Sequence, residues 1–349
     1  MRLPCGTYNE TYDKDMAIVR TRLQWVLLIS GLLVSLVLPL LANEYMLSVL
    51  ILIMIYVIAS LGLNILTGYC GQISAAQAAF VATGAYTSAI LVTKVGLPFW
   101  LAVPSAGIIT GLIGLVLGGP SLRIKGLYVI MATLAAQFII MFVITRWKSF
   151  TGGTIGYAVP PPTLSGITFN TNRSYYYIVF VSLLVMTFIA RNLVRTQVGR
   201  AFVAIRDDDL AAEVMGINVA RYKLIAFFVG CAFAGVAGSL WAHWIRFIDP
   251  QQFTLAHSIR FLAYIIVGGL GTTVGPFFGV IFIELLMEGL GVGFSALGGA
   301  IHGITSYLFA SKEFLFGLIV VLFLIFEPRG LAHRWALFKV AYRLHPFTH

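Results

Sequence analysis

Three consecutive aspartates at 207–209 and a glutamate at 213 form an acidic group whose spacing could do chemistry. Neighbouring carboxylates could hold Mg²⁺ and a diphosphate, as in a membrane-bound prenyltransferase. Such a site needs carboxylates from more than one segment, and the sequence has no second acidic cluster. Arg200 and Arg206 are alternative partners for the aspartates. The pattern therefore favours a contact or structural role over a metal site.

The same segment predicts a short helix over about 207–216. Its aspartates can cap the first turn and place negative charge at the helix N-terminus, and Gly216 can end the helix. A short charged helix beside a membrane is a feature that a partner protein could bind. The candidate contact residues are Arg206, Asp207, Asp208, Asp209, Leu210, Ala211, Ala212, Glu213 and Gly216.

Glycines gather in two apolar segments that lie about 200 positions apart. Glycine lets helices approach closely and lets a span break inside the membrane. In transporters, paired Gly-interrupted segments in different halves point to the substrate pathway, and helix packing is the alternative interpretation. The candidate pathway residues are Gly68, Gly71, Gln72, Ser74, Gln77, Gly268, Gly269 and Gly271.

Ionisable residues in apolar segments are candidates for function. Glu284 and Glu288 stand four apart and so share one helical face, where we expect an interfacial or packing role rather than a proton relay. His243, His257 and His302 fall near predicted span ends without metal-ligand spacing, and we expect them at the membrane interface.

The sequence calls for no cofactor or metal. Cys5, Cys70 and Cys231 are far apart, and we expect them to be small buried apolar residues. The chain contains no Gly-x-x-x-x-Gly-Lys-Ser/Thr phosphate-binding loop. We therefore expect it not to be an enzyme that hydrolyses ATP by itself.

The elements that position these residues are membrane spans. Of the 349 residues, 59% are apolar and 10% are charged, against about 25% charged in soluble domains. The mean hydropathy is +0.94. The apolar residues form runs close to the ~20 positions that cross a bilayer, which excludes a soluble or nucleic-acid-binding protein. We predict an all-α polytopic membrane protein of about ten spans, at 25–42, 45–66, 76–93, 97–118, 126–145, 175–193, 224–242, 258–271, 275–291 and 313–327.

The distribution of basic residues predicts the orientation. With both termini in the cytoplasm, 16 of the 23 Lys and Arg residues face inward, as cytoplasmic loops favour. The net charge of +10 is then a topology signal rather than a sign of nucleic-acid binding. The predicted parts are a cytoplasmic tail at 1–24, a membrane domain at 25–327 with an inner loop at 191–223 and an outer loop at 146–174, and a basic cytoplasmic tail at 328–349.

The inner loop resembles the coupling loop of ATP-binding-cassette (ABC) importer permeases. Leu210-Ala211-Ala212 followed by Met215-Gly216 is the form typical of the branched-chain amino acid permease family, with Leu210 where other importers have glutamate. Other segments resemble the same family, at 61–74, 84–86, 122–128, 151–154, 268–275 and 327–331.

The resemblance implies a permease subunit that imports leucine, isoleucine or valine across a bacterial inner membrane. Its implied partners are separate ABC ATPase subunits on the loop at 191–223, a second homologous permease and an extracytoplasmic solute-binding protein. A permease for urea, short amides or other small organic acids is the alternative within the family. A stand-alone secondary transporter would need ion ligands near the midplane, and the spans offer few.

Overall fold

The computed structural model describes residues 22–119, 127–164, 167–300, 305–327 and 329–344. The longer helices are α2 (Arg22–Leu41), α3 (Glu44–Leu63), α4 (Gln77–Thr93), α5 (Phe99–Gly118), α6 (Leu127–Arg146), α8 (Asn172–Arg195), α9 (Gln197–Asp207), α11 (Val219–Ile245), α12 (Leu255–Gly268), α13 (Gly275–Ala300), α14 (Thr305–Phe326) and α15 (Leu331–Leu344). The short ones are the π-helix η1 (Asn64–Tyr69), α7 (Lys148–Thr151), η3 (Gly153–Ile155), α10 (Asp209–Val214) and η4 (Pro250–Gln252). The four two-residue strands are β1 (Tyr157–Ala158), β2 (Thr163–Leu164), β3 (Ile167–Thr168) and β4 (Phe247–Ile248).

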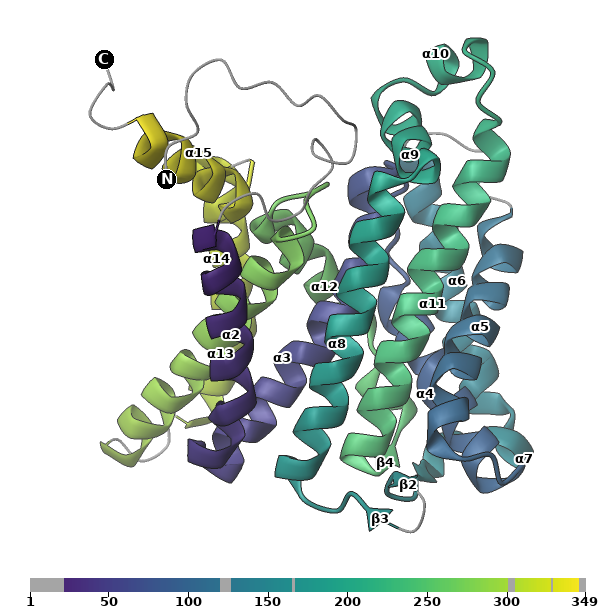
Figure 1. Ribbon diagram of the computed structural model, residues 1–349. Helices are drawn as coiled ribbons and strands as arrows, with labels where there is room; N and C mark the ends of the chain where they lie inside the picture. The colour runs from purple at the N-terminus through teal and green to yellow at the C-terminus, as the bar shows by residue number, and fades with distance from the viewer. Residues whose placement is uncertain (1–21, 120–126, 165–166, 301–304, 328, 345–349) are drawn as a thin grey trace.

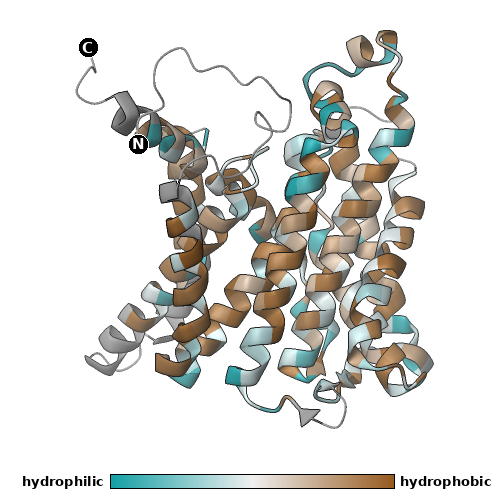
Figure 2. Cartoon of the chain, in the orientation of Figure 1, coloured by the Kyte–Doolittle hydropathy of each residue, from teal (hydrophilic) through white to brown (hydrophobic). Residues whose placement is uncertain are grey.

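Helix α11 is the centre of the bundle and packs along α3, α4 and α5, while α8 lies along α3. Helices α12, α13 and α14 pack on one another, and α12 and α13 also contact α3 (Figure 1). Apolar residues cover the shafts of the helices, whereas hydrophilic residues gather on α9 and α10 (Figure 2). The architecture is the all-α polytopic membrane fold that the sequence predicts.

The predicted number of about ten spans is not supported. Among the described residues, six helices are long and apolar enough to cross a bilayer, or seven if the bent pair formed by Phe314–Phe326 and Leu331–Lys339 is one span. The predicted span at 25–42 contains a shorter apolar helix, Ile29–Leu41, that is not long enough to be counted. The predicted spans at 76–93 and 258–271 form α4 and α12, which have 17 and 14 residues. At 1.5 Å per residue these helices reach only about 26 and 21 Å, less than the ~30 Å hydrocarbon core.

Close approach of glycines holds the central helices together. Gly84 of α4 lies against Gly235 of α11, and Gly62 of α3 lies against Gly230 of α11. A methyl group on Gly238 would clash with the carbonyl oxygen of Val81 and would lie 2.9 Å from the backbone nitrogen of Ala85. Small residues at helix crossings are the usual means by which membrane helices pack tightly.

Replacing Gly238 with alanine is expected to lower the stability of the bundle. The added methyl group has no free volume, and overpacking of this kind costs about 1–3 kcal/mol. Gly289 of α13 is the matched control because a Cβ there meets nothing within 4 Å, and alanine favours the helix. Thermal unfolding in detergent should show a lower midpoint for G238A than for G289A. Equal midpoints would contradict the packing argument.

The predicted outer loop folds over the end of the bundle opposite α9 and α10 (Figure 1). Strand β1 pairs with β4 in antiparallel fashion, which joins this loop to the end of α11. His243 lies beneath it, 1% exposed. Its Nε2 is 3.0 Å from Ser88 Oγ, and its Nδ1 is 3.1 Å from the carbonyl oxygen of Pro160. His243 thus lies near the end of α11 and is buried because the loop covers it, while its position at the membrane interface stays a prediction.

The remaining ionisable and thiol candidates divide between core and surface. Glu284 is buried and accepts a hydrogen bond from the Tyr264 hydroxyl, which gives it a packing role between α12 and α13. His257 is partly exposed, with its Nδ1 3.1 Å from Thr254 Oγ1. Cys70 and Cys231 are buried, as predicted. Cys5 and His302, for which the sequence also made predictions, lie outside the described residues.

Candidate functional site

The two glycine-rich segments meet in space. Helix α3 continues into the π-helix η1, a rare winding that is frequent at functional sites. The side chain of Asn64 in η1 donates from Nδ2 to the carbonyl oxygen of Thr272 at 2.8 Å. Its Oδ1 accepts from the backbone N–H of Gly271 at 3.0 Å. This buried amide therefore holds the turn between α12 and α13 against the end of α3.

Arg206 connects this junction to the inner loop. It lies in the last turn of α9, and its Nη1 donates to the carbonyl oxygen of Gly68 at 3.1 Å. Its Nε and Nη2 donate to Asp207 Oδ1 at 3.0 and 2.8 Å. Gly71 and Gly271 both have positive φ, and a Cβ on either would press on the Arg206 side chain. The guanidinium therefore occupies space that only glycine leaves open.

The predicted short helix is present as α10, from Asp209 to Val214. Asp208 is its N-cap: Oδ1 accepts from the backbone N–H groups of Leu210 and Ala211, at 2.9 and 3.1 Å. Gly216 ends the helix with φ +86°, a conformation that favours glycine. The capping and the end of this helix are confirmed.

The side chains of α10 divide into an inner and an outer face. Ala212 is buried against the protein's own apolar core. The surface instead carries Leu210, Val214 and Met215, which are 64%, 85% and 82% exposed. We call these three residues the α10 apolar tip. Val214 and Met215 were not among the sequence-based candidates, although apolar residues in a charged loop are a readable signal.

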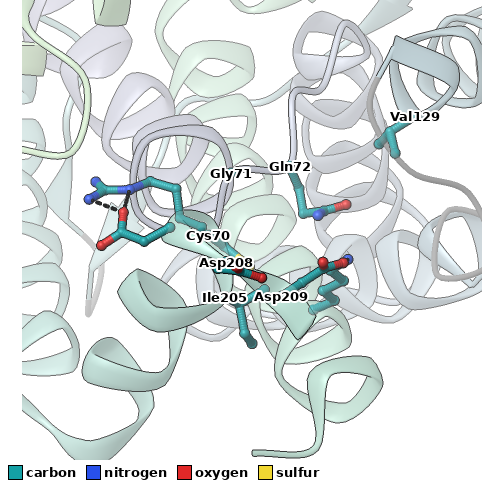
Figure 3. A pocket seen from close by; sticks show the side chains of 10 residues that line it. Cys70, Gly71, Gln72, Val129, Ile205, Asp208 and Asp209 are labelled. Atoms are coloured by element: carbon teal, nitrogen blue, oxygen red, sulfur yellow. Dashed lines mark hydrogen bonds and ion pairs between the residues drawn. The ribbon is translucent and has the colours of Figure 1, made fainter. Parts of the chain in front are cut away.

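A cavity of about 360 Å³ lies between the end of η1 and the start of α10 (Figure 3). It brings together predicted contact residues and predicted pathway residues. Its lining is Cys70, Gly71, Gln72, Val129, Ile205, Arg206, Asp207, Asp208, Asp209 and Lys223. Lys223 is 5% exposed, and its Nζ lies 3.6 Å from Asp209 Oδ2. Sequence reasoning placed Lys223 at the end of the inner loop at 191–223 and missed this buried charge.

The other pathway candidates lie outside this cavity. Gln77 is buried at the start of α4 and donates from Nε2 to the carbonyl oxygen of Ala59 at 2.7 Å. Ser74 Oγ accepts from the backbone N–H of Ala76 at 3.4 Å. Gly268 packs on Gly275 of α13, and Gly269 packs on residues 329–332. Substrate contact by any of these residues stays a prediction.

A smaller apolar cavity lies deeper, between α3, α4, α11 and α12. It has a volume of about 160 Å³ and aromatic walls, from Tyr56, Trp241, Phe253 and Phe261. Beside it, Gln137 accepts at Oε1 from the Ala79 backbone N–H and the Ser258 hydroxyl, both at 3.0 Å. Sequence reasoning did not single out Gln137, because one amide in an apolar run carries no pattern.

Comparisons with known proteins place the chain among transport permeases. The family model described as "branched-chain amino acid transport system / permease component" matches residues 45–324. The high-affinity branched-chain amino acid transport system permease protein LivM of Salmonella typhimurium is 30% identical over 88% of this chain and 75% of its own length. LivM of Escherichia coli is 31% identical with the same coverage. An autoinducer 2 import system permease protein, LsrC of Photorhabdus laumondii, is 30% identical over 33% of this chain and 35% of its own length. No solved structure matches the chain.

Proposed function

The chain belongs to the family of branched-chain amino acid transport permeases, and from this premise we propose that it is the permease subunit of an ABC importer for leucine, isoleucine and valine. The observation that carries the proposal is a continuous chain of contacts from the exposed apolar residues of α10 to the glycines of the membrane helices. The α10 apolar tip is joined through α9 and Arg206 to the glycine junction at Gly68 and Gly271. A movement of α10 would thus reach α3, through η1, and also α12 and α13, through the turn that joins them.

Energy for transport comes, in this proposal, from separate ATPase subunits that dock on α10. The sequence lacks a phosphate-binding loop of its own. The α10 apolar tip stands beyond the end of the bundle, on a hydrophilic segment (Figure 2). Apolar groups clustered on such a surface mark an interaction site. Docking there shifts the equilibrium between two arrangements of the spans only if the docking contacts differ between the two arrangements.

The remaining partners follow from the same assignment. A second homologous permease completes the pathway, and an extracytoplasmic solute-binding protein delivers the amino acid to the face that carries β1 to β4. The cavity beside Gln137 has aromatic and apolar walls that suit a branched aliphatic side chain. The site carries no cofactor, and the protein resides in the inner membrane of a bacterium with both termini in the cytoplasm.

Uptake by the reconstituted transporter tests the proposed function. Proteoliposomes that contain this permease, its partner permease, the ATPases and the binding protein are expected to accumulate tritiated leucine only with ATP. Unlabelled isoleucine and valine should compete, whereas urea and acetamide should not. Omission of this chain is the control. Accumulation of urea in place of leucine would assign the protein to the alternative substrate class.

Thiol labelling tests the orientation. In a background without native cysteines, Ile155→Cys should react with an impermeant thiol reagent in intact cells, because Ile155 is exposed in the predicted outer loop. Val214→Cys should react only after permeabilisation of cells that lack the ATPase subunits. The basic-residue distribution is the reason for this expectation. The reverse labelling pattern would invert the topology.

A further inference from the structure

Two polar residues in the cavity at the base of α10 are buried, and one of them has a side-chain atom without a hydrogen-bond partner among the described residues. Gln72 is 7% exposed, and its Oε1 has no hydrogen-bond partner among the residues that the structure describes. The Lys223 ammonium can donate three hydrogen bonds, yet its ion pair with Asp209 is 3.6 Å long. A charge-assisted hydrogen bond of this kind is normally 2.7–2.9 Å.

Leaving such groups unsatisfied is costly. A buried acceptor without a donor lowers stability, because the loss of its hydrogen bonds to water is not compensated. Both groups line the same 360 Å³ space, together with the carboxylates of Asp208 and Asp209. Figure 3 shows the amide of Gln72 extending from the end of η1 into the region between Asp209 and Val129. The cavity therefore offers the Lys223 ammonium, which lies beside Asp209, and the unpartnered acceptor Gln72 Oε1.

A small zwitterion matches both groups, because its carboxylate can accept from Lys223 and its ammonium can donate to Gln72. We propose that the cavity binds a free α-amino acid, with its carboxylate on Lys223 Nζ and its ammonium on Gln72 Oε1 and the neighbouring aspartates. The apolar side chains of Val129 and Ile205 then face the aliphatic part of the ligand. The identification of this ligand with the transported cargo rests on the proposed function.

Occupancy would act on the coupling segment. Gln72 follows η1, whereas Asp208 caps α10 through its Oδ1. A ligand that bridges them ties α10 to the glycine junction and favours the arrangement in which both lie close. The cavity lies on the predicted cytoplasmic face. Amino acid that has accumulated in the cytoplasm therefore binds in it and slows further import.

Equilibrium binding tests the site. The probe is tritiated leucine, added to the permease pair and ATPases in nanodiscs without the solute-binding protein. The wild-type complex is expected to bind it saturably. Leucinol lacks the carboxylate and 4-methylpentanoate lacks the ammonium, so each should compete at least tenfold more weakly than leucine.

Two variants assign the contacts within the cavity. Lys223→Met should abolish the discrimination between leucine and leucinol, and Gln72→Met should reduce that between leucine and 4-methylpentanoate. Each discrimination is the ratio of two competition strengths measured on one preparation, so partial misfolding does not change it. Gln197→Met is the matched control, because Gln197 is exposed on α9, and it should retain both ratios.

Several outcomes overturn the proposal. Unsaturable binding would mean that the cavity holds water only, and equal competition by 4-methylpentanoate would indicate a simple anion site. Unchanged ratios in both variants would place leucine elsewhere. Leucine uptake by the same wild-type complex, reconstituted in proteoliposomes with the solute-binding protein, separates the two proposals. Uptake without binding at this cavity contradicts the inference alone, whereas binding without uptake contradicts the proposed function.

Discussion

Replacing Val214 with aspartate is expected to abolish substrate-stimulated ATP hydrolysis by the reconstituted transporter. Val214 is 85% exposed at the centre of the α10 apolar tip, so the substitution removes no contact within the chain. At such positions the folding free energy usually changes by less than about 0.5 kcal/mol. In a docked interface, however, the carboxylate would be buried without a partner, and desolvation of a charge is far more costly. We expect the stimulated rate to fall at least tenfold while insertion in the membrane is unchanged.

The matched control is Val95→Asp, which makes the same chemical change at the opposite end of the bundle. Val95 is 62% exposed in the turn between α4 and α5. ATP hydrolysis and co-purification of the ATPase subunits should be normal in this variant and lost in V214D. If V214D retains stimulated hydrolysis at wild-type expression, α10 is a solvated connector and the coupling assignment fails.

The position of Ala212 changes how this segment must be tested. From the sequence alone, Ala211 and Ala212 are small residues suited to close docking with a partner. In the structure Ala212 is buried against the chain's own core, so a large residue there would disturb folding before it disturbed docking. Which face of a six-residue helix turns inward depends on where the ends of α9 and α11 hold it. Local sequence carries no information on that rotation.

Other parts of the fold were predictable because the physical signal is local. Apolar runs of nearly constant length predicted the helices, and the aspartates at 207–209 with Gly216 predicted a helix over about 207–216, which is observed as α10 at Asp209–Val214. The length criterion also explains the error in the span count. Helix α4 is apolar but short and is buried along most of its length, whereas α12 has only 14 residues, of which half are buried.

The site itself depends on contacts between distant segments. Asn64 stands about 200 positions from the turn that it holds, and nothing in its neighbourhood distinguishes it from other polar residues in spans. In the sequence Lys223 ends a charged loop, yet α11 begins at Val219 and turns Lys223 into the cavity. The burial of His243 was not predictable for the same reason, since the strand pairing beside it joins residues about 90 positions apart.

The glycine junction makes the second strong prediction, which is that Gly68→Ala abolishes leucine uptake. A methyl group on Gly68 would collide with the Oδ1 of Asn64 and would lie 2.5 Å from the backbone nitrogen of Gly271. The backbone of the turn after α12 cannot yield without losing both hydrogen bonds of Asn64. The carbonyl oxygen of Gly68 also receives the Arg206 guanidinium, so the same displacement separates α9 from the membrane helices.

The expected pattern distinguishes lost communication from lost structure. Uptake by G68A should fall at least tenfold, because one displacement breaks the contacts of η1 with both α9 and the α12–α13 turn. The variant should still insert in the membrane and bind its ATPase subunits, since the α10 apolar tip is untouched. Gly31→Ala is the control: a Cβ on Gly31 of α2 meets nothing within 4 Å, and uptake should remain at the wild-type rate. Normal uptake by G68A would show that the junction tolerates displacement, and that force from α10 reaches the spans by another route.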